Sequence, residues 1–364
     1  MAAGPAGSHR PGSQNPAYRP DSLVFRPPVE NNRPIEGGGS SGAFRRDLAM
    51  QDRLNQNDVT NRVNVEDPAR VRDAVLALYG ARYPGIDPAP LVRAFADFQA
   101  LFEGNYPGYL ACDTLYHDMR HTLDMTLAMA RLVDGHDRAC ATRDRLGPRR
   151  ALLGVLIALL HDCGYLRRSA ETGVENGAVF TKTHVSRGAE FIAAYLPSLG
   201  FAAEAPVAER LVHFTGYEME IDQIPVGDAR DRMLGCLVGA ADLIGQMSDR
   251  MYLEKCREFL YQEFVWGKVA RERLPDGHEV VRYASAEDLI IKTPGFYEYV
   301  ARTRLQKKLG AADRYAESHF DGPSLYQAEI DRNMDFLRQT IETADFRRLR
   351  RTCYSLSTGA RRAA

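Results

Sequence analysis

Histidine and aspartate residues recur along the chain at spacings that suit metal binding or acid–base chemistry. His161 and Asp162 are adjacent, and they end the apolar stretch ALLGVLIALL of residues 151–160. Such a stretch is typical of a helix buried in the middle of a domain. Because a buried charge is costly unless it is paired or binds a metal, this pair is a candidate for metal ligation.

A second candidate motif, YHDMRHTLDM, occupies residues 116–125. His117 and His121 are four positions apart, so they share one face of a helix, and Asp124 follows on the same face. This spacing suits metal ligation or proton transfer. A surface helix with two exposed histidines would have the same spacing, so the motif decides nothing alone.

Further candidates follow the His161–Asp162 pair. His184 stands at the expected start of a helix, and His213 lies inside an apolar stretch. Asp242 interrupts the apolar sequence VGAADLIG, where an unpaired carboxylate is expensive to bury. A metal would compensate that charge, and so would a hydrogen bond to a neighbouring helix end. Lys182 and Arg187 flank His184 and could bind a substrate phosphate, or they could be solvated charges.

Helices must position these residues, and apolar spacing predicts an all-α fold. Besides the segment from 151 to 168, helices are expected over residues 114–133, 184–196, 204–215, 228–248, 249–265, 285–305 and 324–344. Asp276-Gly277 could close one short hairpin within residues 266–284. Residues 1–64 are rich in proline, glycine and asparagine and predict a disordered tail. One domain is expected over residues 65–345, followed by a basic tail over residues 346–364.

Composition narrows the classes of function. The chain has 364 residues, 45% of them hydrophobic, and a formal net charge of −1. That balance gives no reason to expect binding to a nucleic acid polymer or a membrane. The six cysteines are scattered without a CxxC pair, and no signal peptide is recognisable, so we expect a cytoplasmic protein. A homodimer is compatible with the sequence.

The order of these motifs resembles that of the HD-domain superfamily of metal-dependent phosphohydrolases. YHDMRHTLDM is similar to a motif of class I cyclic-nucleotide phosphodiesterases, with Asp118 in place of an asparagine. HDCGY resembles the HDxGK motif of HD-GYP proteins, with Tyr165 in place of the lysine. The resemblance covers about residues 110–250 and implies an HD-domain helical bundle. The DHxG extension and the purine-binding glutamine of the phosphodiesterases are not recognisable.

The resemblance also implies a ligand set. A first metal would be held by His121, His161, Asp162 and Asp242. A second metal would share Asp162 and add His184 and His213. In the cyclic-nucleotide enzymes the histidine that matches His117 protonates the leaving oxygen, so His117 and Asp162 are the expected catalytic residues.

The expected function is hydrolysis of a small phosphomonoester or phosphodiester, with a nucleotide or cyclic nucleotide as the favoured substrate. Two divalent metal ions would lower the pKa of a bridging water and neutralise charge on the phosphoryl oxygens. A mixed histidine and carboxylate set suits Fe, Mn, Zn, Co or Ni, with Mg at a weaker position. Two alternatives remain from the sequence, an HD-type di-iron oxygenase and a regulatory module that senses a nucleotide.

Overall fold

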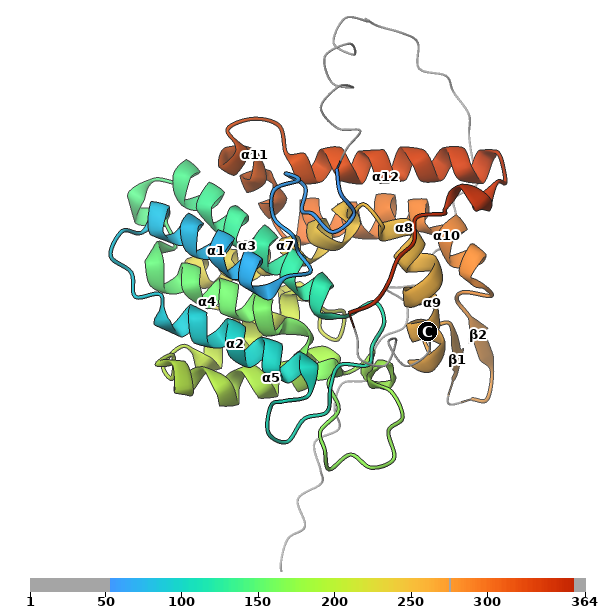
Figure 1. The fold of residues 1–364 in the computed structure, drawn as a ribbon, viewed down its shortest axis with the longest axis horizontal. Coiled ribbons are helices and arrows are strands. Elements are labelled where there is room, and N and C mark those ends of the chain that lie inside the picture. Colours follow the sequence, from blue (N-terminus) through green and yellow to red (C-terminus); the bar gives the residue numbers. More distant parts are fainter. Residues whose placement is uncertain (1–52, 275, 357–364) are drawn as a thin grey trace, which may run out of the picture.

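The computed structural model describes residues 53–274 and 276–356, and over these residues the protein is α-helical apart from one short hairpin (Figure 1). This confirms the predicted all-α fold. The α-helices are α1 (Pro68–Arg82), α2 (Ala89–Glu103), α3 (Met119–Ala139), α4 (Gly147–Leu160), α5 (His184–Tyr195), α6 (Ala205–Leu211), α7 (Ala229–Ser248), α8 (Tyr252–Lys255), α9 (Tyr261–Trp266), α10 (Ala286–Gly295), α11 (Tyr315–Phe320) and α12 (Leu325–Glu342). None of these helices has the length and hydrophobicity needed to cross a bilayer.

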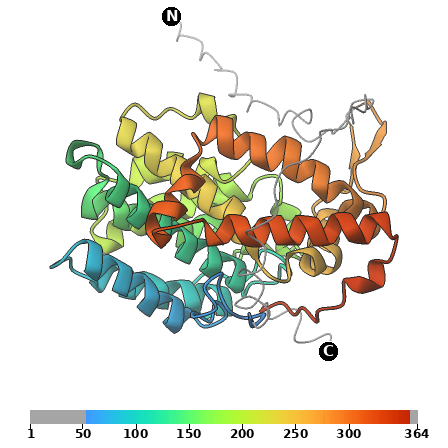
Figure 2. The same cartoon turned by 90° about the horizontal axis from the view of Figure 1, so that it is seen from above.

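Helix α3 forms the centre of the core. It contacts α1, α4, α7 and α11, and almost every residue from Met119 to Asp137 is buried. Helix α12 packs along α7 and covers the bundle on one side (Figure 2). About half of the buried side chains of α3 are polar or charged, so they need partners within the protein.

Helix α4 begins at Gly147 with a proline at its next position and is entirely buried from Ala151 to Leu160. The helix then tightens into a 3₁₀ turn at His161–Tyr165 instead of continuing to residue 168 as predicted. The apolar run therefore ends where the first polar pair begins. In the 3₁₀ turn the side chains of His161 and Asp162 point toward α3 and α7.

A short antiparallel hairpin follows α9, as predicted. Strand β1 (Arg271–Arg273) pairs with β2 (Glu279–Val281), with Arg271 opposite Val281. Three π-helical turns, at Cys256–Leu260, Phe296–Ala301 and Arg304–Lys308, interrupt the helices predicted around the hairpin. Such turns often mark functional sites, and the first two of them contribute to the cavity described below. Helix α9 ends at Trp266, which is 36% exposed.

Both terminal segments pack on the core further than the sequence predicted. The tail predicted over residues 1–64 is wrong for residues 53–64, where Asp58 is fully buried. The basic tail predicted over residues 346–364 is wrong for residues 346–356, because Leu349 is buried and the Leu356 amide donates to Asp118 at 2.8 Å. Residues 1–52 and 357–364 lie outside the described residues, so the disorder predicted for the first segment and the basic tail predicted over the second stay predictions there.

The ion pair between Asp58 and Arg131 anchors the N-terminal segment to α3. Arg131 also donates to the Tyr326 hydroxyl at 2.8 Å. Burial disfavours the Asp58 carboxylate, but Arg131 and the Val63 amide outweigh that cost and lower the pKa of Asp58 to about 2. Because this pKa is below that of an unfolded aspartate, about 3.9, the pair stabilises the protein above pH 4 and less as the pH falls toward 2.

We expect Asp58→Asn to lower the free energy of unfolding by about 3 kcal/mol at pH 7, because it leaves the Arg131 charge buried without its partner. Urea denaturation at pH 7 and at pH 3 measures the effect, and the difference from the wild type should shrink at pH 3. The control is Asp73→Asn, since Asp73 pairs with Arg72 at an exposed position and should cost less than about 1 kcal/mol. Equal losses in both variants would contradict this role for Asp58.

Candidate metal centre

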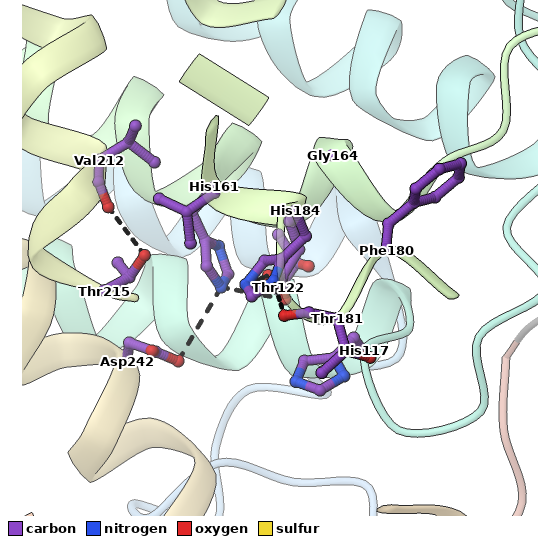
Figure 3. Close-up of polar contacts among 12 residues, drawn as sticks. His117, Thr122, His161, Gly164, Phe180, Thr181, His184, Val212, Thr215 and Asp242 are labelled. Carbon is purple, nitrogen blue, oxygen red and sulfur yellow. Dashed lines mark hydrogen bonds and ion pairs between the residues drawn. The ribbon is translucent and has the colours of Figure 1, made fainter. Parts of the chain in front are cut away.

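Four buried side chains from three parts of the bundle converge at one point. His121 extends from α3, His161 and Asp162 from the turn after α4, and Asp242 from α7. His121 Nε2 lies 3.4 Å from both Asp162 Oδ2 and Asp242 Oδ1. His161 Nε2 lies 3.1 Å from Asp162 Oδ2 and 3.9 Å from Asp242 Oδ1 (Figure 3). The structure thus brings together the four residues expected to hold a first metal.

The hydrogen bonds of two histidines leave one ring nitrogen of each free for a cation. His161 Nδ1 lies 2.8 Å from the Ala158 carbonyl, and His184 Nδ1 lies 2.9 Å from the Thr181 carbonyl. A carbonyl only accepts, so both Nδ1 atoms carry protons, and Nε2 is the atom of each ring that would bind a cation once it has lost any proton of its own. Metal-bound histidines in proteins usually show this arrangement. His184 Nε2 lies 3.9 Å from Asp162 Oδ1, on the second oxygen of that carboxylate.

Two polar atoms of the cluster lie 3.1 Å apart as an ion pair but make no well-oriented hydrogen bond in the described part of the chain. These atoms are His161 Nε2 and Asp162 Oδ2, and both are buried. Leaving such atoms unsatisfied is expensive, and a cation bound between them would remove the cost. His121, His161 and Asp162 also offer ligand atoms that all lie within 4.8 Å of one another. The residues therefore fit a bound metal ion.

The electrostatics of the cluster also favour a cation. Burial disfavours charge on His161, but the adjacent Asp162 and Asp242 carboxylates raise its pKa to about 9. Burial likewise opposes ionisation of Asp162, yet the neighbouring imidazoles hold its pKa far below the usual range. Burial lowers the pKa of His184, which keeps its lone pair unprotonated. A site that stabilises a proton this strongly would also stabilise a divalent ion in its place.

Glycine and a helix cap set the positions of the ligands. A Cβ atom at Gly164 would lie 1.7 Å from the carbonyl oxygen of His184, so only glycine allows α5 to approach the turn after α4 this closely. Asp118 caps α3, and its Oδ1 accepts from the His121 amide at 3.1 Å. Its Oδ2 accepts from the Leu356 amide, so the C-terminal segment holds the same cap.

His117 is held by a carboxylate that the sequence did not identify. Its Nδ1 lies 2.5 Å from Glu263 Oε2, and Glu263 Oε1 accepts from the amides of Tyr116 at 2.6 Å and His117 at 3.2 Å. Glu263 is fully buried on α9. Burial disfavours the charged imidazole, but the Glu263 carboxylate more than compensates and raises the pKa of His117.

Tyr165 links His117 to His184 by stacking. Its ring lies 4.5 Å from the His117 ring at an interplanar angle of 19°, and 4.3 Å from the His184 ring at 18°. The tyrosine therefore packs against both imidazoles, whose own centroids lie 6.2 Å apart, without separating them. Its place within HDCGY was visible in the sequence, but nothing in the pattern indicated a stacked ring.

The remaining predicted site residues are placed differently. His213 does not line the cavity over the cluster, and its charged neighbours are Glu218 and Glu209. It lies in the tight turn Val212–Phe214 after α6, where the predicted helix has already ended. His213 is thus not among the residues that line the cavity, its Nδ1 is buried without a hydrogen-bond partner among the described residues, and its role as a ligand stays a prediction.

The two predicted phosphate-binding cations are also engaged elsewhere. Arg187 binds Glu171 at 2.7 Å and lies 3.6 Å from the centre of the Phe180 ring, and it does not line the cavity. Lys182 does line the cavity, but its ammonium is paired with Glu272 at 2.5 Å.

A cavity opens directly onto the cluster. His117, His121, His161, Asp162, His184 and Asp242 all line it. In Figure 3 the His161 ring points toward Asp242, with His184 and His117 beside it. A small molecule in this cavity could therefore contact a bound metal and the His117 imidazole together.

Comparison with known proteins gives one family match. The model of a family described as Npun_R2479-like matches residues 108–317, more than half of the chain. This range includes every residue of the centre described above and excludes both packed terminal segments. Among curated proteins, no match is found.

Proposed function

The chain belongs to the Npun_R2479-like family, and we propose that it is a metal-dependent phosphohydrolase that cleaves a small phosphomonoester or phosphodiester. The main support is the buried cluster of His121, His161, Asp162 and Asp242, in which His161 Nε2 and Asp162 Oδ2 lie 3.1 Å apart as an ion pair without a well-oriented hydrogen bond. The second support is the buried His117–Glu263 pair beside the same cavity. Together they provide a place for a cation and a nearby proton donor, as hydrolysis of a phosphate ester requires.

In this proposal His121, His161, Asp162 and Asp242 hold a first divalent ion. His184 and the second oxygen of Asp162 provide part of a second position. Fe, Mn, Zn, Co and Ni suit these ligands, with Mg at the weaker position. When bound, the ions would supply a nucleophile by lowering the pKa of a water, and they would neutralise charge on the phosphoryl oxygens. His213 is left out of the ligand set because it does not reach the cavity.

His117 would donate a proton to the leaving oxygen. Glu263 occupies its Nδ1 atom, which leaves Nε2 as the atom that transfers the proton. The carboxylate also favours the protonated imidazole, the form that a general acid needs. Lys182 is left out because Glu272 already neutralises its ammonium. We further propose a cytoplasmic protein, because all six cysteines are free thiols.

The test is to measure the metal content of anaerobically purified protein together with turnover of p-nitrophenyl phosphate and bis(p-nitrophenyl) phosphate. We expect about two metal ions per chain and hydrolysis that EDTA abolishes and one of the six metals restores. Protein that binds metal but hydrolyses neither ester would contradict the proposal. Two irons with consumption of oxygen would then favour an oxygenase, and nucleotide binding without turnover would favour a regulatory module.

A further inference from the structure

The cavity has two chemically different parts. The metal centre forms one part, and six apolar or aromatic side chains from the segments around the hairpin form much of the other. They are Leu260, Phe264, Val269, Tyr283, Leu289 and Phe296. The rings of Phe264 and Tyr283 stack with centroids 5.6 Å apart and an interplanar angle of 19°. The part away from the metal centre therefore offers mainly apolar surface to a ligand.

The hydroxyl groups that line the cavity on threonines already have partners. Thr181 donates to the Ala178 carbonyl at 2.6 Å, Thr215 to the Val212 carbonyl at 2.8 Å, and Thr293 to the Leu289 carbonyl at 2.9 Å. Each bond lies within the local turn or helix. Recognition of a sugar requires polar groups that can exchange water for the hydroxyls of the ligand. These threonine donors are not available for that exchange, whereas the buried Tyr217 hydroxyl of the lining has no hydrogen-bond partner among the described residues and could bind one polar atom of a ligand.

The charged and amide groups of the lining are also engaged. Lys182 and Arg282 both bind Glu272, and Lys292 binds Asp288 at 2.8 Å. The Gln246 amide donates to Asp242 at 3.3 Å. Glu218 accepts from the amides of Val185 and Ser186 at the start of α5. A ligand with further charges would have to break these pairs.

We propose that the organic part of the substrate is a bulky, uncharged and mainly apolar or aromatic group. This inference rests on the proposed function, since the phosphate ester would lie at the metal centre and the organic group among the side chains around the hairpin. Burying apolar area there is favourable. Burying the hydroxyl groups of a sugar without new partners is costly. The cavity therefore favours an aryl or other hydrophobic phosphate ester over a simple sugar phosphate.

The first test uses the wild-type protein and three esters of graded chemistry. 1-Naphthyl phosphate, phenyl phosphate and ribose 5-phosphate present a large apolar, a small apolar and a polar group of intermediate size. We expect kcat/KM for 1-naphthyl phosphate to exceed that for phenyl phosphate by about tenfold, the effect of a few apolar atoms in a fitted pocket. Ribose 5-phosphate should be the poorest of the three.

A matched pair of variants locates the selectivity. Leu260→Trp fills part of the apolar wall and should lower the naphthyl-to-phenyl ratio of kcat/KM by about tenfold. Val265→Trp adds the same group one turn away at a position that is 44% exposed and outside the lining, so it should leave the ratio unchanged. The ratio reports selectivity even if a variant lowers the fraction of folded protein. The wild-type series requires no variant at all.

The outcomes separate this inference from the proposed function. If no phosphate ester is hydrolysed, the proposed function fails, and binding of 1-naphthylmethylphosphonate and of ribose 5-phosphate by calorimetry then tests the cavity alone. Tighter binding of the naphthyl compound would support the apolar pocket. If the esters are hydrolysed but ribose 5-phosphate equals or exceeds 1-naphthyl phosphate, the inference is wrong and the phosphohydrolase proposal stands.

Discussion

Replacing Asp162 by asparagine is expected to abolish tight metal binding and the hydrolysis that depends on it. Asp162 Oδ2 lies 3.1 Å from His161 Nε2 and 3.4 Å from His121 Nε2, and its other oxygen faces His184. Asparagine keeps the shape but removes the negative charge. Loss of an outer partner of a ligand typically costs 10–100-fold in metal affinity, so loss of this shared ligand should cost more than about 100-fold.

The measurement is metal titration by calorimetry, combined with the thermal stability of the protein with and without metal. A metal that binds the folded wild type should raise its melting temperature, and the variant should lose that rise. The control is Asp134→Asn, because Asp134 is also buried on α3 but pairs with Arg82 and His319. That variant should be less stable and still respond to metal. If Asp162→Asn kept the wild-type affinity for metal and the wild-type rise in melting temperature, the assignment of the centre would be wrong.

Replacing Glu263 by glutamine should leave metal binding intact and lower kcat by about 100-fold or more, the usual contribution of a positioned proton donor. Glutamine retains an oxygen that can accept from the Tyr116 and His117 amides, so the local fold should persist. The substitution removes the carboxylate charge that favours the protonated form of His117. That charge offsets two effects that disfavour this form, namely burial of the imidazole and repulsion by metal ions bound at the candidate centre. Glu263 is a positioning residue, since it acts through His117.

The pH profile distinguishes this role from a structural one. His117 must be protonated to act as the acid, so activity should fall as the pH rises through its pKa. The wild-type pKa is raised chiefly by Glu263, once the opposing effect of burial is overcome. Loss of the carboxylate should therefore move the alkaline limb of the kcat profile to lower pH. Glu258→Gln, at an exposed position near α9, should leave the profile unchanged, whereas an unshifted limb in Glu263→Gln would count against the assignment.

The residues of the metal centre could be predicted because their signals are local. His161 and Asp162 end an apolar run, and Asp242 interrupts another, so burial of these polar groups follows from their immediate neighbours. The prediction that His117 and His121 share one helix face is wrong, because α3 begins only at Met119 and His117 precedes it. A buried polar group demands a partner, and helical spacing restricts where that partner lies.

The rest depended on contacts that the sequence pattern does not contain. Glu263 lies 146 positions from His117, in a segment whose charge looks like that of any exposed helix. Residues 53–64 were predicted to be disordered because they contain little apolar area. They are held instead by the buried ion pair between Asp58 and Arg131 of α3. The composition of a segment does not show which distant residue its charge will pair with. His213 does not line the cavity, and its role as a ligand stays a prediction.

The end of α9 has a practical consequence for following this molecule in solution. Trp266 is the one tryptophan of the chain, and it lies three positions after Glu263 on the helix that holds His117. Its partial exposure means that any movement of α9 changes the contact of the indole with water. The emission maximum of an indole depends on that contact. The protein therefore carries an intrinsic fluorescent reporter, without labelling, for events at the wall of its cavity.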